Sequence, residues 1–248
     1  IDSLLPAPLS SLPAPAPEAA AHGERLSKLI ADEIVAAGGW ICFARFMELA
    51  LYAPGLGYYS AGTRKFGAAG DFVTAPELGD LYARTLARQV AQCLRAGLPD
   101  IIELGAGSGR LASDLLSALA ALGSLPQRYQ ILETSAELRA RQKELVRREI
   151  PHLVERIGWL DELPASLEGV IIGNEVVDAM PVHLICAQEE GMAELGVTAA
   201  DGTFAWSARP ASGPLLAAAS ALALDRGYTT EIHLVACAFI RTLARHLT

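Results

Sequence analysis

The feature that most constrains this fold is the run of residues 100–114, whose sequence is DIIELGAGSGRLASD. Its start, with Ile101 and Ile102, is typical of a parallel strand that is covered on both faces. Gly105, Gly107 and Gly109 then let the backbone turn tightly, with no side chain between it and a ligand. Leucines follow at helical spacing, at positions 111, 115, 119 and 122. The run therefore predicts a strand, a turn and a helix whose N-terminus points at whatever the turn holds.

Several known glycine-loop patterns could explain this turn. The dinucleotide pattern needs a small residue where this chain has Arg110, and the phosphate-loop pattern needs a lysine that is absent nearby. What remains is Glu103 followed by three alternating glycines, with Ser108 among them, and this resembles motif I of class I S-adenosylmethionine (SAM) methyltransferases. A carboxylate there would repel a pyrophosphate but suits a ligand with a sulfonium and an ammonium group. The alternative is a glycine-rich turn that binds nothing.

An acidic residue closes the next predicted strand, residues 129–133. In nucleotide-binding βαβ units, an acid at the end of the second strand binds the ribose hydroxyls, and Glu133 stands at that point. Thr134 and Glu137 have the spacing of a capping box that starts the next helix. If they cap that helix, Glu133 is left free for the ribose.

A second polar block precedes the helix predicted from residue 75 to about residue 96. Thr74 and Glu77 form another capping box, and Pro76 fits the first helical turn. Two interpretations stay open for this block: helix capping alone, or capping together with a role beside the cofactor.

Asn174, Glu175 and Asp178 directly follow the predicted fourth strand, residues 169–173, after a third strand at residues 156–159. Because ligands bind at the carboxyl ends of strands in open α/β sheets, these three side chains should face the methyl donor. The alternative is a polar turn in which Asp178 is a local cap.

The sequence outside these motifs predicts how the chain is divided into domains. Residues 1–22 are rich in proline and alanine and are predicted to be flexible. Residues 23–97 form a predicted helical extension, with helices from Glu24 and around residues 43–51, and residues 98–248 form the core. Short antiparallel strands within residues 181–210 predict a β-rich insertion. Residues 215–224 and 231–247 are predicted to be helical, with Glu231 in a first turn.

Composition excludes several classes of function. A formal net charge of −8 and scattered basic residues argue against nucleic-acid binding. No apolar run reaches the ~18 residues of a membrane span. The cysteines and histidines show no metal-ligand spacing, so we predict no metal site, small buried cysteines, and histidines that are structural or at the surface.

Together the motifs resemble one family, the MidA-like methyltransferases, which include the mitochondrial arginine methyltransferase that assembles respiratory complex I. The matching blocks are residues 57–59, 66–67, 70–77, 102–109, 132–135 and 174–181. The resemblance implies an α/β, Rossmann-like class I fold with a seven-stranded core and an N-terminal helical extension. It implies SAM as cofactor, S-adenosylhomocysteine as product, and a protein arginine as substrate, with a complex I subunit as one candidate and a homodimer left open. The location it implies is the cytoplasm of a bacterium or the mitochondrial matrix of a eukaryote.

One part of the family pattern is absent. Family members continue with a Gly-x-Leu-x-x-x-Asp-Tyr-Gly strand, which does not occur before Thr248, so we expect the C-terminal strands of the core to be missing.

The predicted reaction is methyl transfer to a guanidinium that Glu175, Asp178 and Asn174 orient. A small-molecule or other-residue methyltransferase, and a non-catalytic assembly factor that retains a SAM-like site, are the alternatives.

Overall fold

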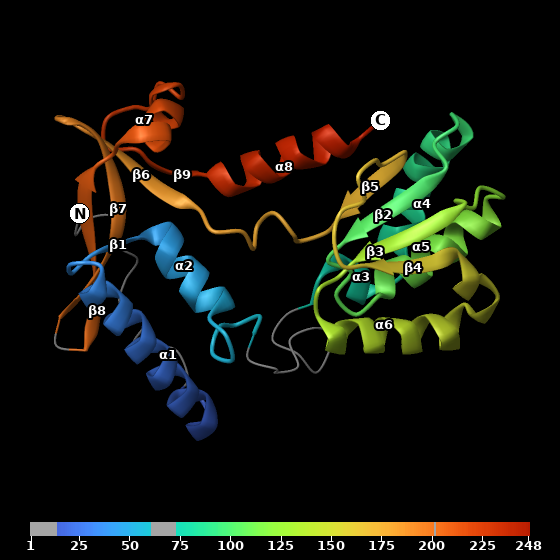
Figure 1. The fold of residues 1–248 in the computed structure, drawn as a ribbon, viewed down its shortest axis with the longest axis horizontal. Helices are drawn as coiled ribbons and strands as arrows, with labels where there is room; N and C mark the ends of the chain where they lie inside the picture. The colour runs from blue at the N-terminus through green and yellow to red at the C-terminus, as the bar shows by residue number, and fades with distance from the viewer. Residues whose placement is uncertain (1–13, 61–72, 201) are drawn as a thin grey trace. The chain divides into compact units, whose positions relative to one another are not determined.

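The computed structural model describes residues 14–60, 73–200 and 202–248. The chain divides into two compact units, which Figure 1 shows with their helices and strands. The parallel unit comprises Thr63–Ala179 and Phe239–Thr248, and the antiparallel unit comprises Ile1–Gly62 and Met180–Ala238. Each unit has its own sheet and its own apolar core.

The sheet of the parallel unit has the strand order β4-β3-β2-β5, with every pair parallel. Its strands are β2 (Asp100–Leu104), β3 (Arg128–Leu132), β4 (Ile157–Leu160) and β5 (Gly169–Gly173). These strands confirm the ones predicted from the sequence. Because they all point the same way, the segments that follow β2, β3 and β5 leave from one edge of the sheet.

Helices cover both faces of this sheet. The helices of the parallel unit are α3 (Ala75–Leu78), α4 (Leu81–Arg95), α5 (Arg110–Ala121) and α6 (Ala136–Glu149), with a short 3-10 helix at Pro151–Arg156. Ile101 lies in one apolar cluster with Leu115 of α5, whereas Ile102 lies in a second cluster with Leu243, in the last turns of α8 (Leu234–His246). β2 is therefore buried on both faces, as its apolar sequence predicted.

Three local predictions in this unit are wrong. The helix expected over residues 75–96 is two helices, because Gly79 adopts a φ of +149°, which L side chains rarely adopt. Thr74 makes no side-chain cap of α3. α6 is capped by Ser135, whose Oγ accepts a hydrogen bond from the Leu138 N–H at 3.3 Å, one residue later than the capping box placed it.

In its described residues, the antiparallel unit contains one sheet and three helices, as well as the first turn of α8. Its strands are β1 (Ile41–Cys42), β6 (His183–Gln188), β7 (Gly191–Ala200), β8 (Thr203–Pro210) and β9 (Thr229–Ile232). Its helices are α1 (Pro17–Ala36), α2 (Phe43–Tyr52) and α7 (Gly213–Ser220). The apolar face of α1, with Ile30 and Ile34, packs against Ile41 of β1 and Val197 of β7.

This pairing changes the predicted domain boundaries. The predicted extension, residues 23–97, is divided: its first two helices pack with residues 180–238, while α4 lies in the parallel unit. The predicted insertion, residues 181–210, continues through α7 and β9. The cause is long-range strand pairing, since β1 pairs antiparallel with β7.

Two end segments also differ from the prediction. Residues 17–22, predicted to be flexible, belong to α1, which begins with Pro17 in its first turn and continues through alanines. Glu231, predicted in a helix first turn, lies in β9, which pairs antiparallel with β6. The β-branched residues around Glu231 favour a strand, and this strand pairs with the edge of β6 that β7 leaves open. None of the helices within the described residues is both long and apolar enough to cross a membrane.

Candidate functional site

The glycine loop, residues 105–109, lies at the carboxyl edge of the parallel sheet, next to the segments that follow β3 and β5. Leu104, the last residue of β2, pairs with Leu132 of β3 and with Gly173 of β5. A side chain at Gly105 would begin 3.4 Å from Val176, in the segment after β5. The predicted site segments around Glu133 and Asn174 therefore flank the loop on its two sides.

The backbone of the loop explains its three glycines. Gly105, Gly107 and Gly109 have φ values of +60°, +54° and +86°, in the left-handed region that favours glycine. At Gly109 there is a second reason, because a Cβ there would lie 3.1 Å from Gln142. Gly109 also directly precedes α5, so the loop delivers the chain into the helix N-terminus.

Gln142 of α6 holds the loop to the neighbouring strand, and the sequence analysis did not identify it. Its side chain is fully buried, and its Nε2 donates to the Gly107 carbonyl at 3.0 Å and to Glu133 Oε2 at 3.2 Å. Its Oε1 accepts from Trp159 Nε1 at 2.8 Å. The only sequence signal was an amide among the charged residues of α6, on the face that carries Val146.

Glu133 is more constrained than predicted. It is buried, and its Oε1 accepts a hydrogen bond from the Ser135 N–H at 2.9 Å, while Oε2 accepts from Gln142. The expectation that Glu133 is left free of helix-start duties is wrong, since it receives that N–H at the start of α6. A carboxylate has about four acceptor positions, so two protein donors leave capacity for a ligand hydroxyl.

The block before α4 meets the glycine loop. Glu77 accepts a hydrogen bond from the Ser108 hydroxyl, and Ser108 Oγ accepts one from the Arg110 N–H at 3.2 Å. Pro76 is buried, and Thr74 lies just before α3. Of the two interpretations of this block, the one that places it beside the loop agrees with these contacts. Residues 66–67 and 70–72 of the family blocks lie outside the described part of the chain.

Glu103 is a buried carboxyl group directly before the loop. It is 2% exposed and accepts a hydrogen bond from the Tyr129 hydroxyl at 2.8 Å. Burial raises the pKa of Glu103 to about 7, Tyr129 opposes that rise, and nearby Glu133 adds to it. Glu103 thus changes its charge near neutral pH, and a cation bound nearby would favour the carboxylate.

Glu175 and Asp178 form a close pair of carboxyl groups in the turn after β5. Both are exposed, Asn174 is half-buried, and Glu175 has a φ of +54°, which is strained for a non-glycine residue. A hydrogen bond with Asp178 and the charge of Asp178 raise the pKa of Glu175. Two carboxylates that repel each other in this way form a suitable site for a planar cation.

The prediction of small buried cysteines is wrong for three of the four, and one cysteine lies in a cluster that its spacing in the sequence did not predict. Cys42, His183 and Glu194 of the antiparallel unit lie together, each with a metal-ligating atom within 4.8 Å of the others. Of the cysteines, Cys186 is buried, Cys42 and Cys93 are half-buried, and Cys237 is exposed. Spacing in the sequence failed to find this cluster because strand pairing creates it.

The comparisons with known proteins give the family of the chain. A family described as S-adenosyl-L-methionine-dependent methyltransferases matches residues 85–248. The chain belongs to this family, the MidA-like SAM methyltransferases. The resemblance seen in the motifs is thereby confirmed, and with it the class I methyltransferase-like α/β fold.

Solved structures and curated relatives agree with the assignment. A superfamily member from Burkholderia thailandensis, solved with bound S-adenosyl-homocysteine, is 50% identical with a TM-score of 0.87 over 96% of this chain and 63% of its own. The mitochondrial protein arginine methyltransferase NDUFAF7 homolog of Caenorhabditis elegans is 31% identical over 64% of this chain and 42% of its own length. The mitochondrial NDUFAF7 of Danio rerio is 28% identical over 68% and 45%. The chain thus spans less than half the length of these two curated relatives.

Proposed function

We propose that the protein transfers a methyl group from SAM to the guanidinium of a protein arginine, and that the parallel unit holds the cofactor. The observation that carries the proposal is the network in which Gln142 joins Gly107 to Glu133. It links the glycine loop to the acidic residue of the next strand, the two elements that a nucleoside ligand with a charged tail requires.

The residues at this edge fit that ligand. Gly105, Gly107 and Gly109 let the loop turn without placing a side chain toward the ligand, and the spare acceptor positions of Glu133 suit the ribose hydroxyls. The charge of Glu103 suits a sulfonium or ammonium group. Glu77, through Ser108, holds the shape of the loop. Thr74 and Pro76 border this contact. SAM supplies an activated methyl group when it is bound.

Glu175 and Asp178 are proposed to bind the acceptor. A guanidinium carries its charge over a plane of N–H donors, and two neighbouring carboxylates can pair with it and fix its direction of attack. Asn174, which directly follows β5, is proposed to orient the nitrogen that accepts the methyl group. The names of the curated relatives support a protein arginine acceptor, and the word mitochondrial in those names supports a mitochondrial location as one of the two expected.

Calorimetry with SAM and S-adenosylhomocysteine tests the cofactor site, with a Gly107→Val variant and a Gly123→Val control. Both glycines have a positive φ and open space around them, so the same strain is introduced, but Gly123 lies in the turn after α5. We expect about 100-fold weaker binding in Gly107→Val, equivalent to about 2.7 kcal/mol, and unchanged binding in Gly123→Val. Equal losses in both variants would reduce the loop to a structural turn.

A transfer assay then tests the acceptor. Peptides that carry arginine, lysine or glutamine at the same position are offered with radiolabelled SAM, and transfer to the arginine peptide is expected. Transfer to another side chain or to a small molecule would keep the enzyme and replace the substrate. SAM binding without transfer to any acceptor would favour the non-catalytic assembly factor.

A further inference from the structure

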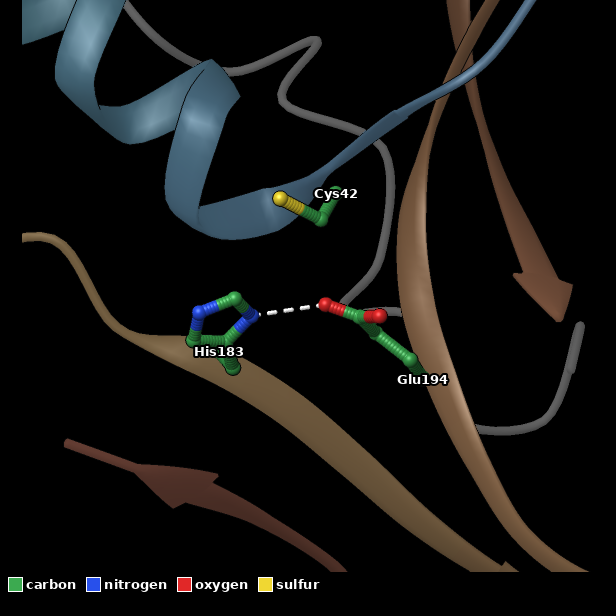
Figure 2. Close-up of side chains that lie close together, drawn as sticks. All are labelled: Cys42, His183 and Glu194. Carbon is green, nitrogen blue, oxygen red and sulfur yellow. Dashed lines mark hydrogen bonds and ion pairs between the residues drawn. The ribbon is translucent and has the colours of Figure 1, made fainter. Parts of the chain in front are cut away.

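The antiparallel unit contains a polar cluster that the methyltransferase function does not use. Figure 2 shows Cys42, His183 and Glu194 pointing toward one another from three separate segments. His183 Nδ1 lies 2.6 Å from Glu194 Oε1, and the ligating atoms of all three residues lie within 4.8 Å of one another. We propose that these three residues bind a divalent transition-metal ion of the zinc class.

Strand register explains why the three side chains meet. On one edge of β7, β6 occupies positions 191–195 and β1 occupies positions 196–197, because β8 fills the opposite edge. Cys42 is the last residue of β1, and His183 is the first residue of β6. The two residues therefore lie next to each other, at the point along β7 where its pairing changes from β6 to β1. Glu194 lies on β7, two residues from Gly196, the partner of Cys42, so it points to the same face. The site is thus assembled by the sheet.

The set of donor atoms selects the kind of ion. A thiolate, an imidazole and a carboxylate are the ligands of zinc, whereas Mg²⁺ and Ca²⁺ prefer oxygen alone. The thiolate and the carboxylate balance the charge of a divalent ion when the imidazole is neutral. Tetrahedral zinc requires donor atoms roughly 3.4–3.6 Å apart. On binding the ion, His183 Nδ1 and Glu194 Oε1, which are 2.6 Å apart, therefore move away from each other and give up their hydrogen bond. Three protein ligands leave a fourth position for water or another donor.

The local environment also supports a thiolate. Cys42 directly precedes α2, whose N-terminus favours negative charge.

The main competing explanation is a reactive-thiol relay, in which a histidine passes a proton between a cysteine and an acid. Such a relay uses the two ring nitrogens on opposite sides of the imidazole, which separates the thiol from the carboxylate. Here the sulfur, one ring nitrogen and one carboxylate oxygen all lie within 4.8 Å of one another. Because the sulfur and the carboxylate oxygen lie close to each other as well as to the ring nitrogen, one ion can contact all three, a proximity that a relay does not require.

The test is a titration of the purified, chelator-treated 248-residue chain with Zn²⁺ by calorimetry and with Co²⁺ by absorption. One equivalent of Zn²⁺ is expected, and Co²⁺ should show a thiolate charge-transfer band. Cys42→Ser, His183→Gln and Glu194→Gln should each weaken Zn²⁺ binding by at least about 10–100-fold, the loss that even changes outside the ligand shell can cause. Cys42→Ser should also abolish the charge-transfer band.

Matched control variants distinguish this site from nonspecific binding of Zn²⁺ to surface residues. Cys237→Ser, His152→Gln and Glu190→Gln change exposed residues of the same types and should leave binding unchanged. Substoichiometric binding to the wild-type chain, or equal losses in a control, would overturn the proposal even if a ligand variant failed to fold. Rapid alkylation of Cys42 without metal binding would indicate the relay instead. Gly107→Val should keep its Zn²⁺, which makes this test independent of the SAM site.

Discussion

The two units of this protein each hold a polar cluster, and the two clusters arise in different ways. In the parallel unit, the residues around the glycine loop follow successive strands that all end at one sheet edge. In the antiparallel unit, Cys42, His183 and Glu194 are brought together by the register of β1 and β6 along β7. Parallel topology therefore makes a site predictable from the order of motifs, whereas antiparallel register can assemble a site that has no motif.

The largest effect is expected at the two carboxylates that are proposed to bind the acceptor in the parallel unit. Changing Glu175→Gln or Asp178→Asn should lower turnover by about 10²–10³-fold, because each removes one charge from the pair that orients the guanidinium. SAM affinity, measured by calorimetry, should stay within about twofold, since neither side chain belongs to the glycine loop. Glu168→Gln, an exposed carboxyl just before the other end of β5, is the control. Unchanged turnover in both variants would refute the assignment of the acceptor site.

Gln142 tests whether the glycine loop depends on its buried support. Gln142→Leu should lower the free energy of unfolding by about 3 kcal/mol, since it leaves the Gly107 carbonyl and the Trp159 N–H without their protein partner. Urea denaturation measures this, and SAM affinity should fall with it. Gln89→Leu, on the exposed face of α4, should change stability by about 0.5 kcal/mol or less. Similar losses in both variants would show that Gln142 has no special role.

The pH dependence of stability tests Glu103. An unfolded glutamate has a pKa of 4.5, and burial raises that of Glu103 to about 7. The folded state therefore holds the proton more tightly, so this contribution to stability is present below pH 4.5 and is lost as pH rises through about 7. Relative to Glu103→Gln, the wild type should lose about 2 kcal/mol of unfolding free energy between about pH 5 and pH 7.

A difference in stability between wild type and Glu103→Gln that does not change with pH would show that Glu103 titrates normally. SAM binding gives an independent readout. The affinity of the wild type for SAM should rise through the same pH range, because a cationic ligand favours the ionised form of Glu103, and the amide variant should lose that dependence.

The smallest expected effect is local protection from hydrogen exchange. S-adenosylhomocysteine should slow amide exchange by a few-fold in residues 104–110, and Zn²⁺ should do so in residues 41–45 and 183–186, because a ligand stabilises the segments that bind it. Glu194→Gln should remove the Zn²⁺ effect alone. Protection of the same residues by both ligands would contradict two separate sites.

Much of the parallel unit followed from its sequence. The apolar strands, the alternating glycines and the polar residues at strand ends predicted β2 to β5, the carboxyl edge and the family. Helix starts were less reliable: the capping boxes at Thr74 and Thr134 fit the pattern, yet Ser135 caps α6 and Glu77 contacts Ser108. A cap depends on which of several neighbouring polar side chains reaches a free N–H, and local spacing does not decide that.

By itself, therefore, the sequence determined the features that depend on near neighbours: strands with apolar runs, turns that need positive φ, and helices with periodic leucines. Tertiary structure decided what depends on distant partners. Gln142 is a buried link because α6 packs beside the glycine loop, and Glu231 lies in a strand because β6 had an open edge. Cys42 lies beside His183 because their strands, β1 and β6, both pair with β7. The physical reason is that backbone and side-chain preferences act locally, whereas pairing across a sheet joins residues that are far apart along the chain.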